Sequence, residues 1–418
     1  MNVTLSKHLP TMSCCYAADR VLMAADSQVE FAQLETVRLS EDRSTCCVVD
    51  SHKRIKELDG LRGIAILLVL LCHSTFELHP SSKILSDLSS VGQLTWSGVD
   101  LFFVLSGFLI GGILLDARHS PQYFRTFYVR RAFRILPPYA GILSLFLFRF
   151  VRPSAGALGE FSPNHIPWLA YFTFTQNLWM AGLGSFGAGT MAATWSLAVE
   201  EQFYLTVPWI VRRITQRRLA IFLIVLIGTV PVVRTVLYLF VRTGSFADYV
   251  LMPCRADALG VGVLVALLVR NPRWYGFTLA NRSVLKKIAL TFLVALAIMT
   301  PQGFAFSGVM VTLGYSCLAF FYGSILLVAL TGASPVLARI LRNKALMQLG
   351  TLAYFTYLFH LLFMEAARRL LVLSMAHSSD LIRFAGGWLG ICLTLFCAAF
   401  SWRYFESPLL RKAHSYKY

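Results

Sequence analysis

The chain has 418 residues, of which 56% are apolar and only 14% are charged. A soluble protein normally carries about 25% charged residues, so this composition excludes an ordinary soluble protein and favours helices buried in a membrane. The net charge of +17 would suit nucleic acid, but the basic residues lie in short segments between apolar stretches, as in the cytoplasmic loops of membrane proteins, so no nucleic-acid partner is expected.

The first 56 residues are polar and lack the apolar core of a signal peptide. They end in a basic run, His52–Lys56, directly before the first apolar stretch, which predicts a cytoplasmic amino terminus. We therefore expect a polar cytoplasmic extension at residues 1–56, or a start assigned too early, with Met12 and Met23 as later candidates. A membrane domain at residues 57–411 and a cytoplasmic tail at 412–418 are expected to follow.

The remaining chain predicts an all-α, polytopic membrane protein of the cell (inner) membrane, with about ten transmembrane helices. The expected spans lie at about residues 60–79, 95–115, 135–151, 195–211, 219–241, 255–270, 287–300, 308–331, 346–367 and 384–403. The stretch 166–181 is also apolar, but if it crossed the membrane, the basic run Arg212–Arg218 would lie outside, against the positive-inside rule. We therefore expect this stretch to be re-entrant or interfacial and both termini to be cytoplasmic; eleven spans are the alternative.

The first predicted span contains Arg62 and His73. An ionisable group near the centre of a bilayer costs roughly 2.5–3.5 kcal/mol, so such a group is rarely present for packing alone. Eleven helical residues place the two side chains on one face, about 16 Å apart, along one possible path. His73 could be a packed imidazole, but within a membrane we interpret it as a base that accepts a proton from a hydroxyl group.

The cysteines do not indicate a metal site. The nine cysteines contain no CxxC pair and no histidine at ligand spacing, so we predict neither a zinc site nor a disulfide framework. No other metal and no bound cofactor is expected. Cys72 precedes His73, but adjacent helical residues point about 100° apart, and we interpret Cys72 as a packing residue.

The second predicted span begins with the sequence GVDLFFVLSG. Gly98, Ser106 and Gly107 are small enough to let helices approach closely. Asp100 lies near the outer end of this span, where it could orient a substrate or pair with an arginine or histidine. Scaffold and site remain equal alternatives for this segment.

A basic segment precedes the third predicted span and contains Arg130, Arg131 and Arg134. Such a run is typical of a cytoplasmic loop. Three guanidinium groups at this spacing would also suit a polyphosphate at the inner surface.

The segment TWSLAVEEQFY contains Ser196, Tyr204 and the adjacent pair Glu200 and Glu201. Adjacent residues cannot share one helix face, so a carboxylate dyad that shares a proton is not expected. We predict that one glutamate faces a cavity and orients the His73 imidazole, whereas the other pairs with an arginine such as Arg234 or Arg255.

Two weaker patterns occur later in the chain. Arg255 and Asp257 are predicted to form a local ion pair. Tyr354, Tyr357 and His360 share a helix face, and such a stripe is more often packing than function. The residues expected to support the site or to contact the acceptor are Asp100, Ser106, Ser196, Tyr204, Arg255, Asp257 and His360.

Five segments in order resemble the acyltransferase-3 family of membrane acyltransferases. They are ELDGLRGIAILLVLLCHS, GVDLFFVLSGFLIGGILL, FYVRRAFRILPPY, TWSLAVEEQFYL and RYFESPLLR, and they extend from Glu57 to Arg411. The resemblance implies transfer of an acyl group, commonly acetyl, from acyl-CoA to a hydroxyl group of a glycan or related acceptor. It implies catalytic roles for Arg62, His73 and the two glutamates, and donor binding by the arginine segment.

The resemblance does not include a periplasmic esterase-like domain, so peptidoglycan-modifying subtypes that carry one are not expected. The family resemblance makes acyl-CoA the expected co-substrate. The acyl chain length and the oligomeric state stay open. The alternative is a proton-coupled transporter or flippase, in which the same ionisable residues would relay protons; this alternative predicts substrate flux without covalent change.

Overall fold

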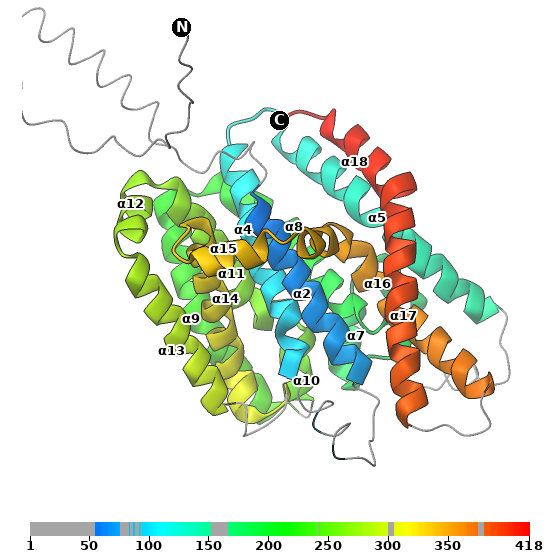
Figure 1. The fold of residues 1–418 in the computed structure, drawn as a ribbon. Helices are drawn as coiled ribbons and strands as arrows, with labels where there is room; N and C mark the ends of the chain where they lie inside the picture. Colours follow the sequence, from blue (N-terminus) through cyan, green and yellow to red (C-terminus); the bar gives the residue numbers. More distant parts are fainter. Residues whose placement is uncertain are drawn as a thin grey trace, which may run out of the picture. The chain divides into compact units, whose positions relative to one another are not determined.

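Helices form all the regular secondary structure in the part of the chain that the structure describes (Figure 1). The computed structural model describes residues 55–75, 94–151, 166–241, 243–299, 305–374 and 380–418, together with positions 83, 87 and 92. The described residues belong to one compact unit. The predicted extension at residues 1–56 lies almost entirely outside the described residues.

Each of the ten predicted spans corresponds to a long helix. These helices are α2 (Lys56–Thr75), α4 (Gly98–Asp116), α5 (Tyr123–Val151), α8 (Thr194–Arg213), α9 (Gln216–Phe240), α11 (Met252–Arg270), α13 (Arg282–Met299), α14 (Tyr315–Leu330), α16 (Lys344–Ser374) and α17 (Asp380–Ser401). Shorter helices are α6 (Trp168–Phe172), α7 (Gln176–Leu183), α10 (Gly244–Val250), α12 (Pro272–Ala280), α15 (Pro335–Leu341) and α18 (Ser407–His414).

Seven helical segments among the described residues are long and apolar enough to cross a membrane. The other three predicted spans form α5, α8 and α13, which are not among these seven segments. The basic segment that was expected to be a loop before residue 135 is helical from Tyr123, and α5 continues through Pro137 and Pro138. The prediction of a loop was therefore wrong for this segment, because its aromatic and arginine residues are compatible with a helix.

The apolar stretch 166–181 is broken into two short helices, α6 and α7. Between them Phe174 adopts a positive φ of 53°, which ends the first helix. A transmembrane helix needs about 20 residues, and neither α6 nor α7 approaches that length. The stretch therefore does not form an eleventh continuous span.

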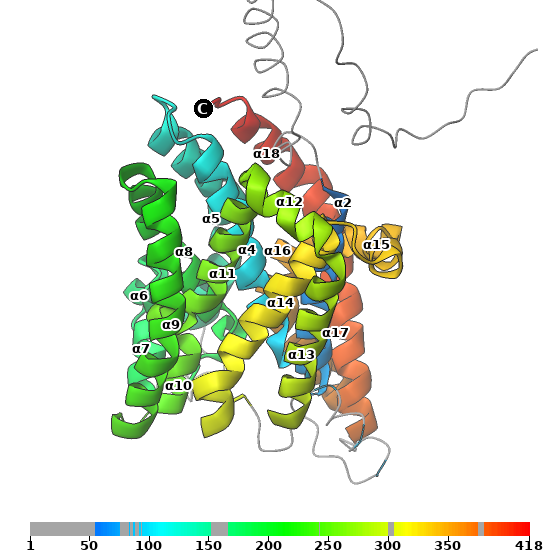
Figure 2. The ribbon, with the colours of Figure 1, turned by 90° about the vertical axis from the view of Figure 1, so that its left-hand side faces the viewer.

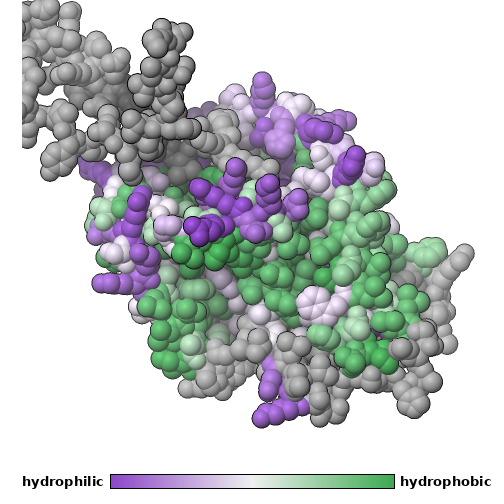
Figure 3. All heavy atoms as spheres, in the orientation of Figure 1, coloured by the Kyte–Doolittle hydropathy of each residue, from purple (hydrophilic) through white to green (hydrophobic). Residues whose placement is uncertain are grey.

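Long helices that are distant in sequence pack side by side. Helix α16 packs along both α2 and α17, and α13 packs along α14, as Figures 1 and 2 show. On the face shown in Figure 3, hydrophobic side chains cover the middle of the molecule, and hydrophilic side chains gather around α12, α15 and α18. Large apolar side chains such as Phe240, Ile298 and Phe396 are 80%, 66% and 73% exposed. This distribution is typical of a surface that faces lipid.

Helices α4 and α11 approach each other at two glycines, as the small residues of GVDLFFVLSG predicted. A side chain on Gly107 would meet the backbone carbonyl of Leu259, and one on Gly262 would meet that of Val104. Because glycine has no Cβ atom, the two backbones can contact each other directly. This contact positions α4 beside the rest of the site.

This contact gives a first testable prediction. We expect Gly107→Ala to destabilise the protein by about 1–3 kcal/mol, because the added methyl group overpacks the crossing. Gly228→Ala on α9 is the matched control, since its Cβ would meet nothing within 4 Å; it should be neutral or stabilising by up to about 1 kcal/mol. Thermal unfolding in detergent measures both, and equal stability of the two variants would contradict the close crossing.

Candidate active site

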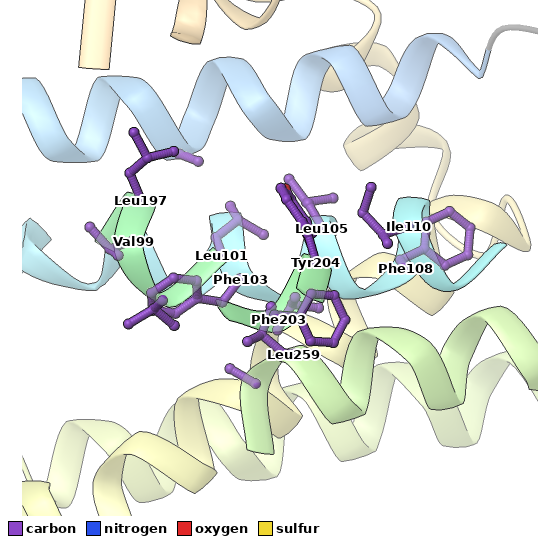
Figure 4. Close-up of a cluster of buried hydrophobic side chains, with 14 of the residues drawn as sticks. Val99, Leu101, Phe103, Leu105, Phe108, Ile110, Leu197, Phe203, Tyr204 and Leu259 are labelled. Atoms are coloured by element: carbon purple, nitrogen blue, oxygen red, sulfur yellow. The ribbon is translucent and has the colours of Figure 1, made fainter. Parts of the chain in front are cut away.

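A first cavity, which we call the arginine cavity, has a volume of about 170 Å³ and lies between α2, α4, α5, α8 and α16. Apolar side chains from α4 form much of its wall. Figure 4 shows Val99 and Leu197 near one end of the contact between α4 and α8, with Leu105 beside Tyr204 farther along. The polar residues that line the cavity are Arg62, Ser106, Arg131, Arg134, Ser196, Glu200, Tyr204, Tyr354 and Tyr357.

The arginine cavity has an excess of positive charge. Arg62, Arg131 and Arg134 contribute three guanidinium groups to its lining, whereas Glu200 contributes one carboxylate. Asp59 lies 3.7 Å from Arg62 and offsets part of that charge. The Nε–H group of Arg131 is buried and donates a hydrogen bond to none of the described residues. A cavity with this charge and an unused donor suits an anionic group such as a phosphate.

Glu200 is held rigidly on one wall of this cavity. Its Oε1 accepts a hydrogen bond from the Ser106 hydroxyl at 2.6 Å, and its Oε2 accepts one from the Tyr204 hydroxyl at 3.1 Å. The sequence had placed Ser106 and Tyr204 among the supporting residues without indicating this contact. Because α4 supplies Ser106 and α8 supplies the other two, the carboxylate ties these helices together.

Arg130 lies apart from the arginine cavity. Its guanidinium group donates two hydrogen bonds, of 3.0 and 2.6 Å, to the carbonyl oxygen of Tyr416 and lies 5.0 Å from the ring centre of Tyr418. Burial raises the pKa of Tyr418, and the charges of Arg131 and Arg130 offset only part of this rise. The ring therefore stays neutral near pH 7 and can bind the cation. The structure thus separates Arg130, which holds the tail, from Arg131 and Arg134, which line the cavity.

A second cavity, which we call the histidine cavity, has a volume of about 270 Å³ and contains His73 in its lining. Its wall is mainly apolar and aromatic. The ring-bearing and charged residues that line it are His73, Trp96, Phe186, Trp195, Tyr249, Phe306, Tyr357 and Arg368. Such a lining offers flat apolar faces with a few polar tips, which is typical of a small-molecule site.

The hydrogen bond of the His73 side chain shows which ring nitrogen can accept a proton. Its Nδ1 lies 2.9 Å from the carbonyl oxygen of Val69, which can only accept, so the proton is on Nδ1 and Nε2 keeps its lone pair. The ring of His360 lies 4.8 Å away at an angle of 69°. His360 is fully buried and donates through its own Nδ1 to the carbonyl oxygen of Tyr357 at 2.8 Å. His360, which the sequence analysis listed among the supporting residues, therefore contacts the candidate base.

Arg368 is a site residue that the sequence analysis missed. It donates a hydrogen bond of 3.1 Å to the carbonyl oxygen of His73, and it lines the histidine cavity. Its position at the carboxyl end of α2 suits the negative end of a helix dipole. The signal that singled out His73, an ionisable residue within an apolar helix, also applies to Arg368.

The two cavities share part of their walls. Val99 and Tyr357 line both of them. The Tyr357 hydroxyl forms a hydrogen bond of 2.6 Å with the Ser196 hydroxyl and lies 3.2 Å from the carbonyl oxygen of Ala193. Arg62 and His73 were predicted to line one path. They instead line two different cavities, which meet at this wall.

The predicted contact between a glutamate and His73 is not present among the hydrogen bonds of the described residues. Glu200 is bound by Ser106 and Tyr204 in the arginine cavity, whereas His73 lines the other cavity. The Oε1 atom of Glu201 is buried without a hydrogen bond from the described chain. The imidazole contacts another histidine in place of the predicted carboxylate.

Two further predictions about ion pairs were wrong. Arg255 pairs with Asp100 of α4, and Arg234 pairs with Asp257 at 2.8 Å; neither arginine pairs with a glutamate. Arg255 and Asp257 do not pair locally, because residues two apart on a helix point about 200° apart and so face different neighbours. Both pairs are at most 1% exposed. These four residues therefore hold α4, α9 and α11 together and do not line either cavity.

Comparison with known proteins matches most of the helical part of the chain. A family model described as an acyltransferase domain matches residues 55–403. The peptidoglycan O-acetyltransferase OatA of Listeria monocytogenes is 26% identical over 380 residues, covering 86% of this chain and 56% of that protein. The O-acetyltransferase OatA of Staphylococcus aureus is 25% identical over 391 residues, covering 87% and 58% respectively.

YrhL of Bacillus subtilis is 30% identical over 339 residues, covering 74% of this chain and 48% of that protein. The chain thus spans about half the length of these curated relatives. No solved structure matches it.

Proposed function

We propose, from the premise that this chain belongs to the acyltransferase-3 family of membrane acyltransferases, that it transfers an acyl group from acyl-CoA to a hydroxyl group of a glycan. Acetyl is the expected acyl group, because the similar proteins from Listeria and Staphylococcus are named O-acetyltransferases. One of them is named for peptidoglycan. Peptidoglycan therefore belongs among the acceptors to be tested, although the sequence alone did not favour it.

The observation that carries this proposal is the pair of cavities that meet at Val99 and Tyr357. The arginine cavity offers Arg62, Arg131 and Arg134 to the phosphates of coenzyme A. The histidine cavity offers the free Nε2 of His73 to an acceptor hydroxyl. The flexible pantetheine arm of the donor would extend from the first cavity to the wall of the second, with the donor entering from the cytoplasmic side and the acceptor from the outer side.

Two routes of transfer use the same nitrogen of His73. In direct transfer, Nε2 takes the proton of the acceptor hydroxyl while the hydroxyl oxygen bonds to the thioester carbonyl carbon; the carbon–sulfur bond then breaks, and the proton passes to the departing sulfur. In the two-step route, Nε2 itself bonds to the carbonyl carbon and the sulfur leaves as a thiolate; the acceptor oxygen then displaces the imidazole, and the proton of the acceptor hydroxyl passes to the thiolate. Both routes yield an ester and free coenzyme A.

The test of this function uses the full chain in nanodiscs with acetyl-CoA radiolabelled in the acetyl group. We expect loss of the thioester and label on a glycan acceptor from a panel that includes peptidoglycan fragments. Label that stays on the protein after removal of free donor would favour the two-step route. A protein that neither binds nor consumes acetyl-CoA or longer acyl-CoA would contradict the proposal and favour the transporter alternative.

The two neighbouring arginines of α5 provide a testable prediction about the donor. Because a charged hydrogen bond contributes roughly 1.5–3 kcal/mol, we expect Arg131→Ala to raise the KM for acetyl-CoA by about 10- to 100-fold. Arg130→Ala is the matched comparison, since Arg130 binds the carbonyl oxygen of Tyr416, and its donor KM should change much less. Steady-state kinetics with varied donor measures both, and the reverse order of effects would show that the polyphosphate binds elsewhere.

A further inference from the structure

The linings of the two cavities have two side chains in common. Val99 lies within the first turn of α4 and is 6% exposed, and Tyr357 reaches the same place from α16. Both residues line the arginine cavity and the histidine cavity. Any group that passes between the cavities at this wall must therefore pass these two side chains.

Contacts on several helices hold the ring of Tyr357 in place. Its hydroxyl is anchored on α8 through Ser196 at 2.6 Å. Its ring meets Phe102 of α4 edge to face, with 5.9 Å between ring centres, and lies 5.9 Å from the ring of His360. The ring of Tyr357 cannot rotate away without breaking these contacts. Its position at the shared wall is therefore fixed.

We propose that Val99 and Tyr357 flank the acyl group of the donor where it reaches His73, and that the space beside these two side chains limits the length of the acyl chain. This inference rests on the proposed function. The polyphosphate of the donor is attracted to Arg131 and Arg134, whereas the reacting nitrogen belongs to His73 in the other cavity. The carbonyl carbon must meet Nε2, so the acyl chain lies at or beyond the shared wall.

Selection by this wall follows from its packing. Each added methylene group must fit beside a buried valine and an anchored tyrosine, and overpacking a close-packed wall is unfavourable. One methylene in a fitted pocket changes kcat/KM by roughly 10- to 200-fold. We therefore expect the wild-type protein to prefer acetyl-CoA to butyryl-CoA by at least about tenfold.

The decisive experiment compares kcat/KM for acetyl-, propionyl- and butyryl-CoA in the full chain. Val99→Ala removes two carbon atoms from the wall, so the preference for acetyl over butyryl should fall by about tenfold or more. Val104→Ala is the matched control: it makes the same substitution on the same helix at a fully buried residue that lines neither cavity. The control should keep the wild-type ratio of the donors.

Two further variants keep the inference testable if Val99→Ala folds poorly. Tyr357→Phe keeps the ring but removes its hydrogen bond to Ser196, and it should lower the same preference for acetyl. Val99→Leu reduces the space at the shared wall. It should decrease transfer by about tenfold or more, while the Kd for acetyl-CoA stays within about threefold of wild type.

Each outcome has a separate meaning. An unchanged donor ratio in Val99→Ala and Tyr357→Phe, with acetyl transfer by the wild type intact, overturns this inference alone. An equal shift in Val104→Ala also overturns it, because the effect would then come from general loosening of α4. A wild-type protein that consumes no acyl-CoA overturns the proposed function and this inference with it.

Discussion

Replacement of His73 by asparagine is expected to lower acyl transfer by roughly 10²–10⁴-fold, which is the usual contribution of a general base. Asparagine can still donate a hydrogen bond to the carbonyl oxygen of Val69, as Nδ1 of His73 does at 2.9 Å, but it has no basic nitrogen at the position of Nε2. The loss should therefore appear in kcat for acetyl transfer, measured with saturating donor. Thermal unfolding and the Kd for acetyl-CoA should stay close to wild type.

Cys72 provides the control for this experiment. It is also in the lining of the histidine cavity, and it is a free thiol. We interpret it as a packing residue, so Cys72→Ala should retain most of the activity. Activity that survives in His73→Asn but is lost in Cys72→Ala would assign the chemistry to the thiol and refute the role of His73.

Asp257→Ala is expected to destabilise the folded protein by about 3–5 kcal/mol, because it leaves the charge of Arg234 buried without its carboxylate. Arg234 is fully buried and lies 2.8 Å from Asp257, and the Ser316 hydroxyl donates a hydrogen bond of 2.6 Å to the same carboxylate oxygen. The substitution thus removes the acceptor for two donors. The expected result is a lower unfolding temperature in detergent and a lower yield of monodisperse protein.

An exposed ion pair serves as the comparison. Glu365 and Arg369 pair on the surface of α16, with side chains 32% and 62% exposed. Surface pairs contribute at most about 1 kcal/mol, so Glu365→Ala should change the unfolding temperature little. If both substitutions had equal small effects, the pair between Arg234 and Asp257 would not be a structural element of the fold.

The helical architecture could be predicted from local sequence. Each of the ten apolar stretches forms a helix. A long apolar run favours the lipid and a polar segment favours water, and both preferences can be read from the local sequence. The short break at Phe174 also agrees with the prediction that residues 166–181 do not cross as one helix. The family was equally evident from the order of its segments, which the family model over residues 55–403 confirms.

Helical periodicity also placed Arg62 and His73 correctly on one helix, but it could not say what each side chain faces. That depends on neighbouring helices, and α16 supplies Tyr357, which divides the space beside α2 into two cavities. The same limit explains why one of the two glutamates was expected beside His73, whereas Glu200 binds elsewhere. Its partners are Ser106 and Tyr204, and the contact to Ser106 bridges 94 positions in the chain.

One physical cause separates residues that the sequence analysis grouped together. Arg130 and Arg131 are equivalent in sequence, yet one binds the tail and the other lines a cavity, since adjacent helical residues diverge by about 100°. Arg255 and Asp257 were expected to pair and instead bind partners on α4 and α9. The amino-acid sequence determines which segments are helical, which polar groups they bury and to which family the chain belongs. Only the packing of the helices decides which buried charges meet, because each pairing depends on the rotation and crossing of segments that are far apart in the chain.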